Sequence, residues 1–207
     1  MPARSGEDYV ARLRETEKER EVWLEGERIT DLTRHQAFKN TVESLAHLYD
    51  MQHDPAYKTK LTYRLDSGES AGLSFLMPRT IDDLKRRGGM LKVWAEATCG
   101  MMGRSPDFLN AAIMVFAAGR DFFGQADKRF AENVQNYYEH CRDNDLLLTH
   151  AIIDPQVDRS KLRHEQADPF TILGRVKETD QGIVVRGAKM LATLGPLADE
   201  LLVYPFG

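Results

Sequence analysis

Apolar residues recur every three or four positions in several stretches of the first 150 residues, a spacing that places them on one face of an α-helix. Four helices are predicted, each listed here with its apolar positions. The first follows Thr33–Gln36 (Phe38, Val42, Leu45, Tyr49) and the second follows Thr80 (Leu84, Leu91, Trp94, Ala95, Thr98). The third begins at Ser105 (Leu109, Ala112, Ile113, Phe116) and the fourth covers Asp127–Leu147 (Phe130, Val134, Tyr137, Cys141). Thr33 and Thr80 are predicted helix caps, because a threonine hydroxyl can accept a bond from a first-turn N–H. The first helix should end before Asp54 and Pro55, since the residue before a proline avoids helical backbone.

The pattern changes after Asp154, where shorter apolar stretches bounded by turn residues replace the helical spacing. We predict strands over Phe170–Lys177 and Gly182–Arg186, joined by a turn at Glu178–Gly182, and a third strand over Leu201–Tyr204. Helices followed by strands indicate an α+β fold. We therefore expect a helical N-terminal domain over residues 1–150 and an incomplete middle β domain over residues 151–207.

Composition narrows the class of protein. The net charge of -4 and the pI near 5.9 argue against nucleic acid or an anionic membrane as the main partner. The first residues lack the apolar segment of a secretory signal. Cys99 and Cys141 have neither metal-ligand spacing nor a disulfide framework, so no metal site is expected. The plain expectation is a cytoplasmic protein.

Two residues are candidates for chemistry on local grounds. Arg104 precedes a predicted helix start in which Ser105 is the cap, Pro106 the first residue and Asp107 the acid at the positive end of the dipole. A cation beside unpaired helix N–H groups can bind an anion or a polar oxygen, although most such junctions are simply well-capped helices. His150 follows the last predicted helix, where it can exchange a proton or simply bond a nearby carbonyl.

The motifs around these two residues resemble those of the 4-hydroxyphenylacetate 3-hydroxylase family, the oxygenase components of two-component aromatic hydroxylases that use reduced flavin. The similar segments follow in the family's order and span essentially the whole chain: Arg4–Tyr9, Val22–Arg28, Leu48–Pro55, Ser74–Pro78, Gly100–Asn110, Thr149–Arg159, Gly182–Met190 and Ala192–Thr193. The resemblance implies an acyl-CoA-dehydrogenase-like fold, with a helical N-terminal domain followed by the start of a β-barrel domain. It also implies that this chain is an N-terminal fragment, without the C-terminal helical bundle through which the family forms homotetramers.

The resemblance also assigns roles to particular residues. Arg104 and His150 would be catalytic and would reach the phenolic oxygen of the substrate. Phe108 would contact the substrate where the family has a tyrosine, so a different phenol is credible. The flavin contacts carried over are His150, Ala151, Ile152, Gln156, Val157, Asp158, Arg159 and Thr193. Without the family, Asp158 and Arg159 would be expected in a solvated loop and Thr193 in a cross-strand pair.

The activity implied is hydroxylation of a phenolic substrate, similar to 4-hydroxyphenylacetate, ortho to its hydroxyl. FADH2 would come from a separate flavin reductase and O2 would be the second substrate, as in the catabolism of aromatic compounds. The chain has no Gly-x-Gly-x-x-Gly after a strand, so a Rossmann-type FAD site is not supported. Two alternatives stay open. One is a flavoprotein like 4-hydroxybutyryl-CoA dehydratase, disfavoured because its iron–sulfur cluster needs several thiolates. The other is a non-catalytic fragment with an assembly role.

Overall fold

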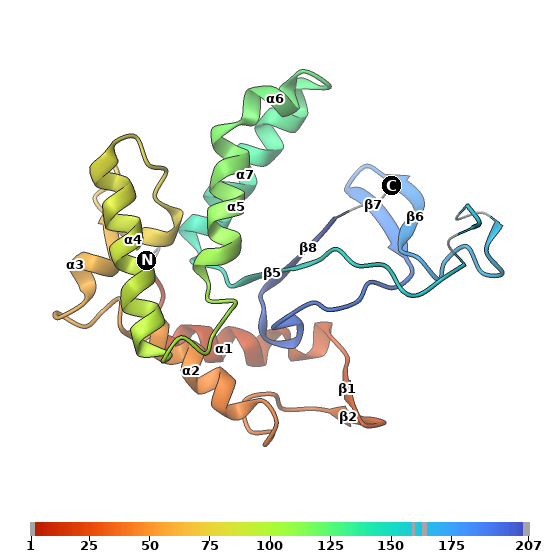
Figure 1. Cartoon of the computed structure of the whole chain (residues 1–207), viewed down its shortest axis with the longest axis horizontal. Coiled ribbons are helices and arrows are strands. Elements are labelled where there is room, and N and C mark those ends of the chain that lie inside the picture. The colour runs from red at the N-terminus through yellow and green to blue at the C-terminus, as the bar shows by residue number, and fades with distance from the viewer. Residues whose placement is uncertain (1–2, 159, 163–164, 205–207) are drawn as a thin grey trace. The chain divides into compact units, whose positions relative to one another are not determined.

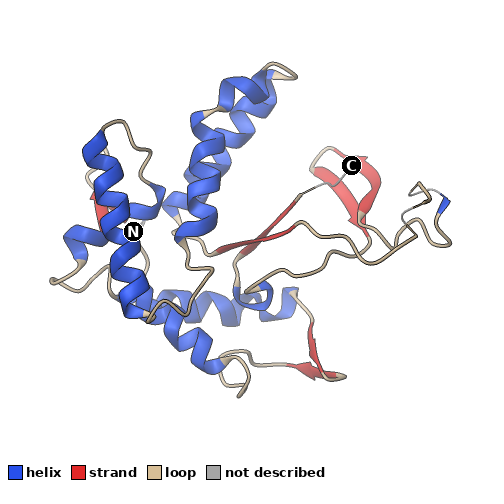
Figure 2. Cartoon of the chain, viewed as in Figure 1, coloured by secondary structure: helices blue, strands red, loops and turns tan. Residues whose placement is uncertain are grey.

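The computed structural model describes residues 3–158, 160–162 and 165–204, and the chain divides into two compact units (Figure 1). The first unit comprises Met1–Leu148 and Pro196–Asp199, and the second comprises Thr149–Gly195 and Glu200–Gly207. Among the described residues, all α-helices belong to the first unit (Figure 2). The fold is therefore a mixture of helix and strand.

The first unit combines seven α-helices with two short hairpins in the described residues. The helices are α1 (Gly6–Glu15), α2 (Lys39–Asp50), α3 (Lys58–Leu61), α4 (Ile81–Ala97), α5 (Asp107–Ala118), α6 (Arg120–Gly124) and α7 (Lys128–Asp143). The antiparallel hairpins are β1 (Val22–Leu24) with β2 (Glu27–Ile29), and β3 (Thr62–Arg64) with β4 (Ser70–Gly72). These strands have three residues each, which is too short for alternation to reveal them, so the sequence does not predict them.

One apolar cluster at the centre of this unit joins α2, α3, α4 and the segment after β4. Its buried members are Leu48, Met51, Leu61, Leu73, Met90 and Trp94. The apolar positions predicted for α2 are largely confirmed, because Val42, Leu45 and Tyr49 are buried. The predicted cap at Thr33 is wrong. The Thr33 hydroxyl bonds Asp31 at 2.6 Å in a turn, and the helix begins later, at Lys39.

α4 begins as predicted but buries a different face. The Thr80 hydroxyl accepts the Asp83 N–H, and the Asp83 side chain in turn accepts the Thr80 N–H, which makes a complete capping box. Leu84 and Leu91 are nevertheless 58% and 42% exposed. Ala95 is exposed as well, Thr98 is only half-buried, and Trp94 is the one predicted position that is buried. The predicted stripe was therefore wrong, and Met90 and Trp94 form the core face.

Three further expectations about the helices need correction. Pro106, rather than Ser105, is the residue before α5, and its side chain makes no cap bond. α7 ends at Asp143 rather than Leu147, because Asp145 adopts a left-handed φ of 47° that a continuing helix cannot accommodate. Phe130, predicted on the apolar face of α7, is 48% exposed.

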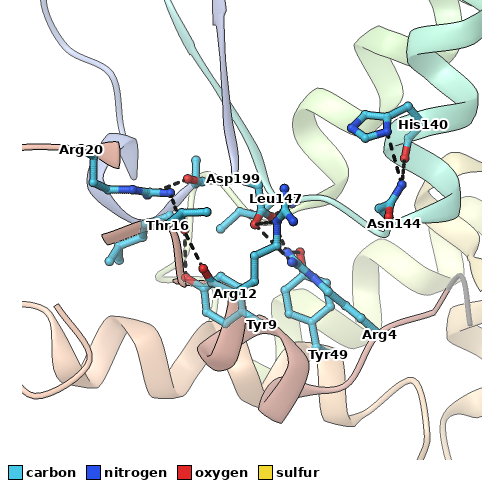
Figure 3. A network of polar contacts seen from close by, with 12 residues as sticks. Arg4, Tyr9, Arg12, Thr16, Arg20, Tyr49, His140, Asn144, Leu147 and Asp199 are labelled. Carbon is cyan, nitrogen blue, oxygen red and sulfur yellow. Dashed lines mark hydrogen bonds and ion pairs between the residues drawn. The ribbon is translucent and has the colours of Figure 1, made fainter. Parts of the chain in front are cut away.

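A buried polar network ties residues 196–199 to the N-terminal segment of the same unit (Figure 3). The Asp199 carboxylate accepts hydrogen bonds from the Arg4 guanidinium at 2.6 Å, the Arg12 guanidinium at 3.1 Å and the backbone N–H of Leu147 at 2.7 Å. Arg4 also donates to the Tyr49 hydroxyl at 2.9 Å. The network therefore holds residues 196–199 within the first unit.

The second unit contains the remaining strands. They are β5 (Leu148–Ala151), β6 (Gly174–Thr179), β7 (Gly182–Arg186) and β8 (Glu200–Val203). β5 is hydrogen-bonded to β8, and β6 forms an antiparallel hairpin with β7 (Figure 1). The Gly182–Arg186 strand is confirmed in full, whereas β6 begins at Gly174 instead of Phe170. Gly187 has a φ of 127°, and a side chain there would meet the carbonyl oxygen of Ile172 at 2.6 Å.

Candidate functional site

Arg104 stands two residues before Pro106, at the end of a loop that leads into α5. The loop turns through Cys99 and Gly100, which have φ values of 51° and 70°. The Arg104 guanidinium lies 4.4 Å from the centre of the Phe108 ring, which stands in the first turn of α5. One of its N–H groups donates to the Gly103 carbonyl at 3.0 Å, and the side chain is exposed. The structure thus presents a cation whose plane is held against an aromatic ring.

The start of α5 is anchored to the segment Ser74–Pro78. Asn110, which is fully buried, donates to the Ser74 hydroxyl at 2.9 Å. The Ser105 hydroxyl donates to Asp107 at 2.6 Å, so it does not cap the helix. Burial raises the pKa of the Asp107 carboxyl, against the lowering effect of the Ser105 bond. Two of the segments that resemble the family's motifs are therefore in direct contact in the folded unit.

His150 lies on β5, not at the junction between a helix and a loop that the sequence indicated. Its imidazole is half-buried and packs edge-on against the ring of Tyr204, with centroids 6.3 Å apart and planes at 90°. The Tyr204 backbone N–H donates to the Ala151 carbonyl at 3.1 Å, so the pairing of β5 with the chain after β8 holds both rings together. Burial raises the pKa of the Tyr204 phenol.

The chain beyond β5 is held by Lys189. The Lys189 ammonium lies 2.6 Å from the Asp154 carboxylate and donates to the Ile152 carbonyl at 3.0 Å. The Lys189 side chain is only 6% exposed, so this ion pair is shielded from water. The Met190 backbone N–H also donates a hydrogen bond to the Ile153 carbonyl at 2.8 Å. The segment that carries the candidate flavin contacts Ala151 and Ile152 therefore has a fixed path.

Thr193 lies in a turn between Leu191 and Gly195. Its own side chain is exposed, and its backbone carbonyl accepts a hydrogen bond from the buried hydroxyl of Thr149. The neighbours Leu191 and Leu194 have φ values of 61° and 63°, a left-handed conformation that residues other than glycine adopt rarely. This geometry differs from the cross-strand pair that the sequence alone favoured.

The remaining candidates follow Asp154 in a loop. Gln156 and Asp158 are exposed and Val157 is half-buried. Asp158 accepts the Ser160 N–H at 3.0 Å, and these bonds with Ser160 lower the pKa of its carboxyl. Arg159 lies outside the described residues.

The structure brings the candidates together in two groups. Arg104 and Phe108 form one group in the first unit. His150, Ala151, Ile152 and Thr193 form the other in the second unit, joined through Thr149 and Lys189. Sequence reasoning assigned no role to Thr149, Lys189 or Tyr204. Thr149 and Lys189 lie within family-like motifs, which was the available signal.

The described residues contain no group of three or more histidine, cysteine or acidic side chains able to hold a metal ion. Cys99, which is exposed, and Cys141, which is buried, are not joined in a disulfide. None of the helices in the described ranges has the length and apolar character needed to cross a membrane.

Known proteins resemble this chain along nearly its full length. The family model described as 4-hydroxyphenylacetate 3-hydroxylase N terminal matches residues 5–207. The oxygenase component of 4-hydroxyphenylacetate 3-monooxygenase from Thermus thermophilus is 50% identical over 203 residues, which is 98% of this chain and 40% of that protein. The chain thus spans about two fifths of the length of this curated relative.

Solved structures agree with these matches. A crystal structure of the oxygenase component of 4-hydroxyphenylacetate 3-monooxygenase, complexed with FAD and 4-hydroxyphenylacetate, superposes with a TM-score of 0.88 at 50% identity. It covers 98% of this chain and 41% of that one. An archaeal 4-hydroxybutyryl-CoA dehydratase from N. maritimus superposes with a TM-score of 0.81 at 20% identity, and the match covers 98% of this chain and 40% of that one. At this low identity the likeness shows a shared fold alone.

Proposed function

Because the chain belongs to the 4-hydroxyphenylacetate 3-hydroxylase family, we propose that it is part of the oxygenase component of a two-component, FADH2-dependent monooxygenase. The substrate class is a phenol similar to 4-hydroxyphenylacetate, hydroxylated ortho to its hydroxyl group. The observation that carries this proposal is 50% identity along 98% of the chain to an oxygenase component whose crystal structure holds FAD and 4-hydroxyphenylacetate.

Arg104 is assigned to the phenolic oxygen of the substrate. A guanidinium offers five N–H donors in a plane, and only one of those of Arg104 bonds the Gly103 carbonyl. The Phe108 ring lies 4.4 Å from the guanidinium carbon and restricts how the Arg104 side chain can move. A phenolate oxygen is a good acceptor for such a donor set. Phe108 itself can offer the substrate an apolar contact but no hydrogen bond.

His150 is assigned to the proton of the same hydroxyl. A neutral imidazole can accept the phenolic proton, and loss of that proton makes the ring more electron-rich at the ortho carbon. The edge contact with Tyr204 and the position on β5 restrict how the imidazole can turn. A base held in this way loses little entropy when the substrate binds, which favours catalysis.

The residues of the second unit fit a flavin. The exposed Thr193 hydroxyl and the exposed Gln156 amide can bond the polar edge of an isoalloxazine ring. Asp154 is paired with Lys189 and Asp158 with Lys161, so two carboxylates of this region are compensated beside a cofactor that carries phosphates. When bound, reduced FAD would supply the activation of O2. We assign the cofactor to His150, Ala151, Ile152, Gln156, Val157, Asp158, Arg159 and Thr193.

The finer architecture belongs to the same proposal. We assign the domains to residues 1–150 and 151–207, with the second as the beginning of a β-barrel in an acyl-CoA-dehydrogenase-like protein. Full-length members would add a C-terminal helical bundle and assemble as homotetramers. A separate flavin reductase would deliver FADH2 in the cytoplasm, where Cys99 and Cys141 would stay reduced.

The test supplies the chain with FADH2, O2 and a panel of para-substituted phenols, and detects catechols by mass spectrometry. We expect catechol from wild type and a loss of roughly 100-fold or more in Arg104→Ala and in His150→Ala, because a positioned acid–base group contributes about 10²–10⁴-fold. Matched controls are the exposed Arg34→Ala and His47→Ala, which should keep the wild-type rate.

The outcomes separate the alternatives. Wild-type turnover in both site variants would contradict the assigned roles of Arg104 and His150. A wild-type chain that neither retains FAD on gel filtration nor makes catechol would favour the non-catalytic assembly role. A brown, oxygen-sensitive preparation with cluster absorbance would instead favour the dehydratase-like flavoprotein.

A further inference from the structure

Thr149 occupies an unusual position for a hydroxyl. It is the residue before His150 on β5 and is only 4% exposed. Successive side chains of a strand point to opposite faces, so Thr149 turns away from the face that carries the imidazole. Its hydroxyl donates to the backbone carbonyl of Thr193, which lies 44 positions later in the chain. A single side chain thus connects the strand of the candidate base to the loop of a candidate flavin contact.

The loop around Thr193 needs an external support. Its own backbone bonds, from Thr193 to Leu191 at 3.1 Å and from Gly195 to Ala192 at 2.8 Å, shape the turn but do not attach it to β5. Leu191 and Leu194 both hold left-handed backbone, a conformation that persists only where surrounding contacts impose it. The Thr149 hydroxyl attaches this loop directly to β5 through the Thr193 carbonyl.

A second link acts on the other side of His150. Lys189 binds the Ile152 carbonyl and the Asp154 carboxylate, and so fixes the chain that leaves β5. The contacts of Lys189 hold residues 152–154, whereas the hydrogen bond from Thr149 holds residues 191–194. The two links together set the spacing between the backbone at His150–Ile152 and the hydroxyl of Thr193.

We propose that Thr149 is a positioning residue, whose hydroxyl holds the Thr193 loop in register with β5 so that Thr193 and the His150–Ile152 backbone contact one flavin. This inference rests on the proposed function, because the flavin is the group that both segments would bind. Thr149 itself is turned inward and contacts the loop, not the cofactor. Its effect on binding is therefore indirect.

The experiment uses the 207-residue chain and measures FAD affinity by fluorescence titration, together with hydrogen exchange of the peptide that contains residues 191–195. Thr149→Val keeps the shape of the side chain but removes the donor. We expect roughly three- to tenfold weaker FAD binding and faster exchange in that peptide, as for the loss of one hydrogen bond. Thr149→Ser retains a hydroxyl and should restore both values.

Thr179→Val is the matched control. Its hydroxyl also donates to a backbone carbonyl, that of Gly182 at 3.0 Å, but in the β6–β7 turn. The Thr179→Val variant should leave FAD affinity and hydrogen exchange at residues 191–195 unchanged.

Each outcome has a definite meaning. A Thr149→Val chain that binds FAD with wild-type affinity overturns the positioning role, whether or not the loop exchanges faster. Failure of Thr149→Ser to restore affinity also overturns it. A wild-type chain that does not bind FAD overturns the flavin function, and the positioning role with it, which distinguishes the two failures.

Discussion

The two units of this chain bury their apolar residues to very different degrees. The first unit encloses a cluster around Leu48, Met90 and Trp94 and a polar network around Asp199. In the second unit, the buried residues among those described are Thr149, Ala151 and Gly174. The hairpin β6–β7 exposes apolar side chains on both faces: Val176, Ile183, Val184 and Val185. Side-chain packing stabilises the first unit, whereas backbone hydrogen bonds and two buried polar links hold the second.

The largest expected effect comes from breaking the polar network of the first unit. Asp199→Ala removes the carboxylate that binds Arg4, Arg12 and the Leu147 N–H. Arg4, with a side chain only 7% exposed, would then be a buried cation without its carboxylate. We expect the free energy of unfolding of the first unit to fall by about 3–5 kcal/mol. Urea unfolding followed by tryptophan fluorescence measures this, because Trp23 and Trp94 both lie in the first unit.

The control for this variant removes an ion pair on the solvent-exposed surface of the same unit. Asp82 is 86% exposed and lies 3.3 Å from Lys85 on α4. Asp82→Ala should leave the urea midpoint where it is in wild type, since exposed pairs contribute little. Equal midpoints for Asp199→Ala and wild type would mean that the network does not stabilise the first unit.

A smaller effect compares the interiors of the two units directly. Leu48→Ala opens a cavity at a fully buried position and should cost about 2–5 kcal/mol. Val184→Ala on β7 should change stability by about 0.5 kcal/mol or less, because Val184 is already 41% exposed. Urea unfolding followed by tryptophan fluorescence reports the first variant, and far-ultraviolet circular dichroism reports both. A comparable loss in the two variants would contradict the contrast between the units.

The features that the sequence predicted correctly depend on neighbouring residues. The helix cap at Thr80 and the strand Gly182–Arg186 are both defined within a few positions. The helical stretch before Asp54 was identified for the same reason, although its first turn was misplaced at Thr33.

The errors concern contacts between distant residues. Periodicity identified an apolar face on α4 through Leu84 and Leu91, but it cannot tell which face meets the core. His150 was placed at the end of the last predicted helix because β5 is a strand only through its pairing with β8, some fifty residues later. The hydrogen bond from Thr149 to Thr193 has no local pattern at all. The family resemblance gave both segments a shared role, and the structure supplies the physical link between them.

The smallest effect concerns the pH dependence of the first unit. Asp145 is 2% exposed and accepts the Gln52 amide at 2.7 Å and the Arg4 N–H at 3.3 Å. Burial raises the pKa of this carboxyl to about 6, with Asp199 adding to the rise while Gln52 and Arg4 oppose it. The folded state therefore holds the proton more tightly than the unfolded state. This contribution to stability is complete below pH about 4 and is lost as the pH rises to about 6, by roughly 1–3 kcal/mol in all.

Asp145→Asn tests this sign, because its amide cannot ionise. We expect the difference in urea midpoint between the variant and wild type to shift in favour of the variant as the pH rises from about 4 to 7. Tryptophan fluorescence at each pH gives the two midpoints. Parallel curves over that range would mean that Asp145 titrates alike in the folded and unfolded chains, and a shift in favour of wild type would mean that its charge is stabilised by Arg4 more than it is opposed by burial.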